Sequence, residues 1–207
     1  MNRKNFLKFS IYFAFFALLL GGVWGQTNWI GTNGTAWDDP GNWDSGLPAP
    51  GNEPSIPVVA SNWPSTVNTS MPTGWTSLTI DNGAQATIPV EISINSITNN
   101  GDLTLDANIT LSGSLTGTGT STINADITTT GAQTYDGAVT LGATVVLTAN
   151  STVTFNDEVI GSSNSLTIEG NAKFNGEVVA GSLEVNGTSA INADITTTGA
   201  QTYDGAV

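Results

Sequence analysis

The sequence predicts an all-β protein, a right-handed parallel β-solenoid whose N-terminal end is covered by a Trp- and Pro-rich cap. Three observations predict it. Residues 113–139 and 181–207 are two copies of one stretch and differ at only four positions. Short segments alternate apolar residues with Thr, and Gly-containing corners separate them. Many very short strands with tight corners are typical of stacked coils, whereas a sandwich or an up-and-down barrel has longer strands.

Residues 1–25 have the pattern of a secretory signal peptide. Three basic residues within the first eight positions precede the apolar run 11–20, and small residues follow it. The run is shorter than the roughly 18 residues of a membrane-spanning helix. We expect cleavage after Gly25, which would leave Gln26 first; the alternative is an uncleaved anchor.

The charge of the chain restricts its possible partners, and its lack of cysteine restricts how the fold can be stabilised. Without residues 1–25 the chain has 17 carboxylates and a single basic residue, Lys173, so its net charge is −16. We expect no nucleic acid partner, because binding phosphates requires clustered Lys and Arg. The chain has no Cys, so apolar packing and backbone pairing must stabilise it in place of disulfides.

Residues 26–76 form the predicted cap. Large aromatic side chains can seal the first coil, and Pro cannot donate to a strand ladder, so the segment suits the end of a solenoid. The clearest turns lie at 39–42 (DPGN) and 49–52 (APGN). The segment contains Trp29, Trp37, Trp43, Trp63 and Trp75 together with seven prolines.

Residues 77–207 form the predicted solenoid. Each strand should bury its first and third residues and expose the Thr between them. The Asn-Gly and Asp-Gly corners favour positive φ. At about 20 residues per coil, within the usual repeat length, the offset between the two copies would equal about three coils. The clearest strands are 78–80, 103–105, 109–111, 139–141, 153–155 and 166–168.

Equivalent positions of the two copies predict core contacts. Tyr135 and Tyr203 correspond, and an aromatic at a fixed place in a coil is expected to fill the core rather than stack on a ligand. The second copy stops at Val207, whereas the first continues into 140–142 (TLG), so we expect a longer reading frame.

Catalytic, metal and cofactor sites are not expected. The chain has no His and no Cys, which removes the usual nucleophile and base pairs and the commonest metal ligands. Paired carboxylates could still hydrolyse glycosides, which keeps a polysaccharide-active enzyme as a weaker alternative. Asp38, Asp39 and Asp44 lie close together, but their spacing matches no calcium-loop pattern and favours turns.

Two tryptophans are the candidate ligand-binding residues. Trp37 and Trp43 have Gly and Asp neighbours, which indicates surface loops, and flat aromatic faces can pack on sugar rings. A carbohydrate-binding module is therefore one hypothesis. The other, which we favour for these residues, is that they seal the cap.

Two segments carry a resemblance to a known group. Residues 37–51 read WDDPGNWDSGLPAPG, and residues 131–141 read GAQTYDGAVTL, with a copy at 199–207. With these segments the chain resembles the filamentous-haemagglutinin and autotransporter-passenger group of bacterial β-solenoid adhesins. The resemblance implies a secreted or surface-exposed adhesive protein whose partners are glycans or surface proteins. A membrane would be reached only through an anchor outside this chain.

Overall fold

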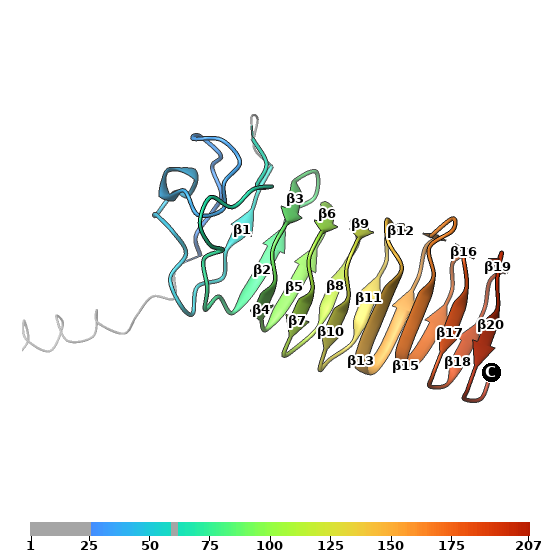
Figure 1. Cartoon of the computed structure of the whole chain (residues 1–207). Helices are drawn as coiled ribbons and strands as arrows, with labels where there is room; N and C mark the ends of the chain where they lie inside the picture. The colour runs from blue at the N-terminus through green and yellow to red at the C-terminus, as the bar shows by residue number, and fades with distance from the viewer. Residues whose placement is uncertain (1–25, 59–61) are drawn as a thin grey trace, which may run out of the picture.

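The computed structural model describes residues 26–58 and 62–207, which form a parallel β-solenoid preceded by an irregular cap. In Figure 1 the strands lie side by side along one axis, with the blue N-terminal segment at one end and the C-terminus at the other. The prediction of an all-β, parallel β-solenoid is confirmed. The predicted signal peptide at 1–25 lies outside the described residues.

Each turn of the solenoid contributes three strands, which build three faces. Face 1 contains β2 (Ser77–Ile80), β5 (Ser96–Asn99), β8 (Leu115–Gly117), β11 (Gln133–Tyr135) and β18 (Ser189–Ile191). Face 2 is a seven-stranded sheet of β3 (Gln85–Ile88), β6 (Asp102–Leu105), β9 (Thr120–Ile123), β12 (Val139–Leu141), β14 (Val159–Ile160), β16 (Val178–Ala180) and β19 (Ile195–Thr197). Face 3 contains β4 (Ile92–Ile94), β7 (Ile109–Leu111), β10 (Ile127–Thr129), β17 (Leu183–Val185) and β20 (Gln201–Tyr203).

Two long strands turn the corner between faces 3 and 1. β13 (Val145–Phe155) and β15 (Leu166–Phe174) begin on face 3 and end on face 1, which joins these faces into one sheet. All pairs between named strands are parallel. Since face 2 takes one strand from each turn, the solenoid has seven turns, and we number these rungs 1 to 7 from the cap.

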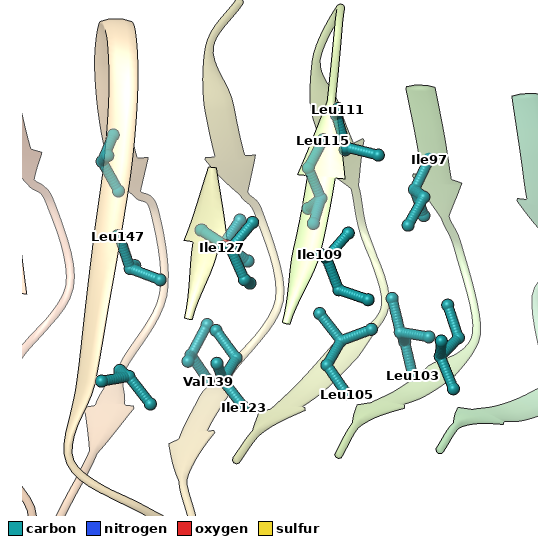
Figure 2. Close-up of a cluster of buried hydrophobic side chains, with 14 of the residues drawn as sticks. Ile97, Leu103, Leu105, Ile109, Leu111, Leu115, Ile123, Ile127, Val139 and Leu147 are labelled. Atoms are coloured by element: carbon teal, nitrogen blue, oxygen red, sulfur yellow. The ribbon is translucent and has the colours of Figure 1, made fainter. Parts of the chain in front are cut away.

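The core is a stack of equivalent side chains from successive rungs. Apolar residues two apart are buried and the Thr between them points outward, as predicted for Leu103-Thr104-Leu105. Figure 2 shows Ile109, Ile127 and Leu147 in line between the ribbons, and these residues are paired in register. Such columns bury apolar surface continuously along the solenoid. Each Å² of apolar surface removed from water stabilises the fold by about 25 cal/mol.

An aromatic column extends the core through rungs 4 to 6. The ring of Tyr135 stacks on that of Phe155 at 5.1 Å between centroids with 10° between planes. Phe155 stacks in turn on Phe174 at 5.7 Å and 8°. Tyr135 is 2% exposed, so the prediction that it fills the core is confirmed.

The corner glycines are needed for a different reason from the predicted one. Among the predicted corner pairs, only Gly83 has a positive φ, of 81°. At Gly101 an added Cβ would clash with the carbonyl oxygen of Ala84, and at Gly176 it would clash with that of Asp157. Both oxygens belong to the preceding rung. The corners require glycine because stacked backbones leave no room for a side chain.

The two copies of the repeated stretch lie on different faces. Thr128 lies in β10 on face 3, whereas its counterpart Thr196 lies in β19 on face 2. The offset between the copies therefore spans three turns and two further faces, rather than the predicted three turns. Rungs differ in length: Gln85 pairs with Asp102, 17 residues on, whereas Val145 pairs with Leu166, 21 residues on.

Residues 26–58 and 62–76, which we call the cap, cover rung 1. β1 (Ser55–Ile56) adds a parallel strand to β2, and the backbone N–H of Thr87 donates to the carbonyl of Pro64 at 2.8 Å. A 3-10 helix, η2 (Pro40–Asn42), occupies the first predicted turn, and the backbone N–H of Asn52 closes the second by donating to the carbonyl of Ala49. The cap thus satisfies strand edges that would otherwise be open.

Candidate functional site

The two tryptophans predicted as ligand-binding residues lie inside the cap. Trp37 is fully buried and Trp43 is 3% exposed. They contact each other and Trp29 and Trp75, with ring centroids 5.2 to 6.3 Å apart. Tilted and edge-on ring contacts of this kind stabilise aromatic clusters.

The indole nitrogens of Trp37 and Trp43 bond to backbone carbonyls, whereas that of Trp75 is buried without a hydrogen-bond partner among the residues that the structure describes. Nε1 of Trp37 donates to the carbonyl of Thr87 in β3 at 2.8 Å, and Nε1 of Trp43 donates to the carbonyl of Trp37 at 2.9 Å. The first of these bonds ties the cap to rung 1. Since other side chains cover both rings, neither can stack on a sugar in this structure, and both serve the packing of the cap.

The aspartates beside these tryptophans bond to the protein itself. The carboxylate of Asp38 accepts hydrogen bonds from residues 68–70, that of Asp39 from the backbone N–H of Gly41, and that of Asp44 from Asn28. Within residues 26–58 and 62–207, no group of three or more acidic, His or Cys side chains could hold a metal ion. The contact of Asp39 lies within a turn, as expected, whereas Asp38 and Asp44 bond to segments that are distant in sequence.

One aromatic residue that the sequence did not single out does line a hollow. Trp63 is half-buried at the junction between the cap and face 2, beside a hollow of about 440 Å³. Gln85 and Asp102 also line it, and Nε2 of Gln85 donates to the carboxylate of Asp102 at 3.3 Å. Only the contact between distant segments creates this arrangement, so no local sequence pattern could have found it.

The most regular surface feature is a column of hydroxyl side chains on each face. These residues point outward, and parallel register places them about 4.8 Å apart from rung to rung. Each column is a run of four or five Thr, except that the third begins with Ser. On face 1 the column is Thr79, Thr98, Thr116, Thr134 and Thr154; on face 2 it is Thr87, Thr104, Thr122 and Thr140; on face 3 it is Ser93, Thr110, Thr128 and Thr148.

The charges of the solenoid lie mainly beside these columns. Asp106, Asp126 and Asp136 lie exposed at corners between strands, and Asp102 lies at the start of β6. The columns themselves consist of neutral residues until rungs 5 and 6, where Glu169 follows Thr148 and Lys173 follows Thr154. Each column is therefore a neutral, hydroxyl-bearing strip bordered by acidic corners.

The fold and these strips define the class of protein, a parallel β-solenoid with repetitive neutral faces. Comparisons with protein families, curated proteins and solved structures gave no match. Across residues 26–58 and 62–207, no helix has the length and apolar character needed to cross a membrane.

Proposed function

We propose that the protein is a secreted or surface-exposed structural adhesin, a rigid rod that binds neutral, hydroxyl-rich surfaces such as polysaccharides. The repetition of Thr at the same strand position in successive rungs carries the proposal. Each Thr hydroxyl offers one donor and acceptor sites. A single such contact is weak, but a column of equally spaced contacts gains avidity from multivalency.

The charge of the chain supports the same class of partner. Acidic corners beside each strip repel polyanions, and the scarcity of basic residues leaves little to bind them. A neutral polymer meets neither obstacle. The signal-like residues 1–25 and the resemblance to β-solenoid adhesins support a location outside the cell.

A sedimentation assay on insoluble polymers tests the proposal. Cellulose, chitin and starch are mixed with the wild-type chain and with a Thr122→Lys/Thr140→Lys variant of face 2. We expect the variant to bind at least one polymer measurably less than the wild type does, because two long charged side chains interrupt one of the three neutral strips while the other two remain. Thermal melting confirms that the variant folds.

A matched control changes the net charge by the same amount outside the strips. Asp157→Asn/Glu158→Gln removes two negative charges at an exposed corner, a net change of +2 as in the lysine variant, and should bind as the wild type does. Equal loss in both variants would show that net charge, rather than the strip, controls binding. Wild-type protein that sediments with none of the three polymers would contradict the proposal.

A further inference from the structure

The hollow beside Trp63 lies at the cap end of the face 2 strip. Its lining combines cap residues 62–65 with residues of β3 and β6, which lie next to the cap in Figure 1. Thr87 and Thr104, the first two members of the face 2 column, are part of that lining. The hydroxyl-bearing strip therefore runs directly into the hollow.

Two planar polar groups face this hollow in a fixed arrangement. Gln85 and Asp102 are exposed and directly paired at the starts of β3 and β6. Oδ2 of Asp102 accepts from Nε2 of Gln85 at 3.3 Å, and its Oδ1 accepts from the hydroxyl of Thr120 at 2.7 Å. Since a carboxylate has about four acceptor positions, it can take further hydrogen bonds from the hydroxyls of a ligand.

Trp63 supplies the apolar part of the hollow. Its side chain packs partly against the hydrophobic core and is otherwise accessible. The other tryptophans of the cap, Trp29, Trp37, Trp43 and Trp75, are all buried. One flat ring beside a few polar groups is the usual composition of a small-molecule site. The hydrophobic C–H face of a sugar ring fits such a surface, while its hydroxyls fit the polar groups.

The charge and size of the hollow restrict the ligand further. Its lining includes one charged side chain, that of Asp102, and no basic residue. An anionic sugar would therefore be repelled, whereas a neutral one would not. The volume of about 440 Å³ lies within the range of roughly 300–1,000 Å³ that is common for small-ligand sites.

We propose that this hollow is a binding site for one or two sugar units of a neutral glycan, whose chain continues along the face 2 strip. The inference rests on the proposed function, because it names the place where the same polymer is held most specifically. The strip supplies many weak contacts, and the hollow supplies one defined contact. Asp102 and Gln85 orient the sugar hydroxyls, and Trp63 packs on its ring.

Tryptophan fluorescence of the whole chain tests the site with cellobiose, chitobiose and maltose as probes. Because Trp63 is the accessible tryptophan among those that the structure describes, a ligand in the hollow should change the emission in a saturable way. We expect this for at least one disaccharide. No saturable change with any of the three, checked by calorimetry, overturns the inference.

Two double variants locate the binding. Gln85→Ala/Asp102→Ala removes the polar groups and should weaken disaccharide binding by at least about tenfold. Because both positions are exposed, the melting temperature of this variant should stay close to that of the wild type. Asp157→Asn/Glu158→Gln should bind the disaccharide normally, since it changes an exposed corner that does not line the hollow. Binding that survives Gln85→Ala/Asp102→Ala overturns the inference.

The two proposals fail in different ways. If the wild type sediments with a polymer but binds no disaccharide, the hollow is not a sugar-binding site, and the proposal that the strips bind polymer still stands. If a disaccharide binds through Gln85 and Asp102 but no polymer is bound, the hollow is supported and the adhesive strip is contradicted.

Discussion

Gln133 is a polar residue in the middle of the apolar core, and Tyr135 explains why it is tolerated. Gln133 is fully buried, its Nε2 donates to backbone carbonyls of Ile127 and Thr148, and its Oε1 accepts from the hydroxyl of Tyr135. Burial of the Tyr135 hydroxyl raises its pKa, so the group stays protonated and remains a donor. A buried network in which each of these polar groups has a hydrogen-bond partner fixes the register of neighbouring strands.

We expect Tyr135→Phe to destabilise the protein far more than Thr140→Val. The first change leaves Oε1 of buried Gln133 without its donor, which costs about 1–3 kcal/mol of unfolding free energy. The second removes an exposed hydroxyl from face 2 and should cost less than about 0.5 kcal/mol. Urea denaturation measures both. Equal losses would contradict the role of the buried hydrogen bond.

Sequence reasoning found only half of this pair. The position of Tyr135 within a repeated coil indicated a core aromatic, because a large ring at a fixed place is best buried. Gln133 gave no such indication, since Gln is mostly exposed in proteins. Its burial depends on the Thr148 carbonyl of β13, which belongs to a distant part of the sequence and is invisible to local pattern.

At the scale of elements, a single carboxylate joins two distant segments of the cap. The oxygens of Asp38 accept from the backbone N–H groups of Asn68, Thr69 and Ser70 and from the Thr69 hydroxyl, at 2.7 to 3.4 Å. These bonds lower the pKa of Asp38 from 3.8 to about 2, and the bond from the backbone N–H of Asn68 has the largest effect. The ionised form is therefore favoured by folding.

We expect Asp38→Asn to lower the melting temperature by a few degrees at pH 7. Because the folded-state pKa is depressed, the ionised carboxylate contributes its full stability above about pH 4 and loses it as the pH falls through about 2. The difference between wild type and variant should therefore shrink between pH 4 and pH 2. Circular dichroism melts at several pH values measure it, with Glu184→Gln, an exposed carboxylate of β17, as the control. A difference that stays constant down to pH 2 would contradict the charge-assisted bonds.

Strands were easier to predict than corners or cap. Alternation of apolar residues with Thr, as in Val139-Thr140-Leu141, depends on the two sides of one strand and is present in the local sequence. Gly101 and Gly176 are constrained by a carbonyl one rung away, so the expectation of positive φ was wrong there. For Trp37 and Trp43, Gly and Asp neighbours suggested an exposed loop, but contacts with the other cap tryptophans bury them.

For the whole molecule, the offset between the two sequence copies is not a whole number of rungs. The copy that begins at Gly181 therefore starts on a different face from the copy that begins at Gly113. Identical sequence is accepted on two faces because all three have the same pattern of buried and outward residues. Repeat length alone could not predict this, because longer corners such as 161–165 change the length of single rungs.

The hydroxyl-bearing strips lie on all three faces and therefore surround the rod. The proposed adhesin would therefore be able to contact a surface in more than one orientation, whereas the hollow beside Trp63 belongs to face 2 alone. The strips were partly predictable, because the Thr between apolar residues was expected to point outward. Their alignment into columns was not, since it depends on the register between rungs.

Cysteine cross-linking tests that register most directly, since the chain has no Cys of its own. Thr122 and Thr140 are distant in sequence but paired in neighbouring strands β9 and β12. Their Cα separation of about 4.8 Å permits a disulfide. We expect Thr122→Cys/Thr140→Cys to form an intramolecular disulfide readily under mild oxidation. Thr122→Cys/Thr134→Cys, which is closer in sequence but lies on two faces, should not. Efficient cross-linking of the second pair, or failure of the first in the folded protein, would contradict the solenoid register and the columns that depend on it.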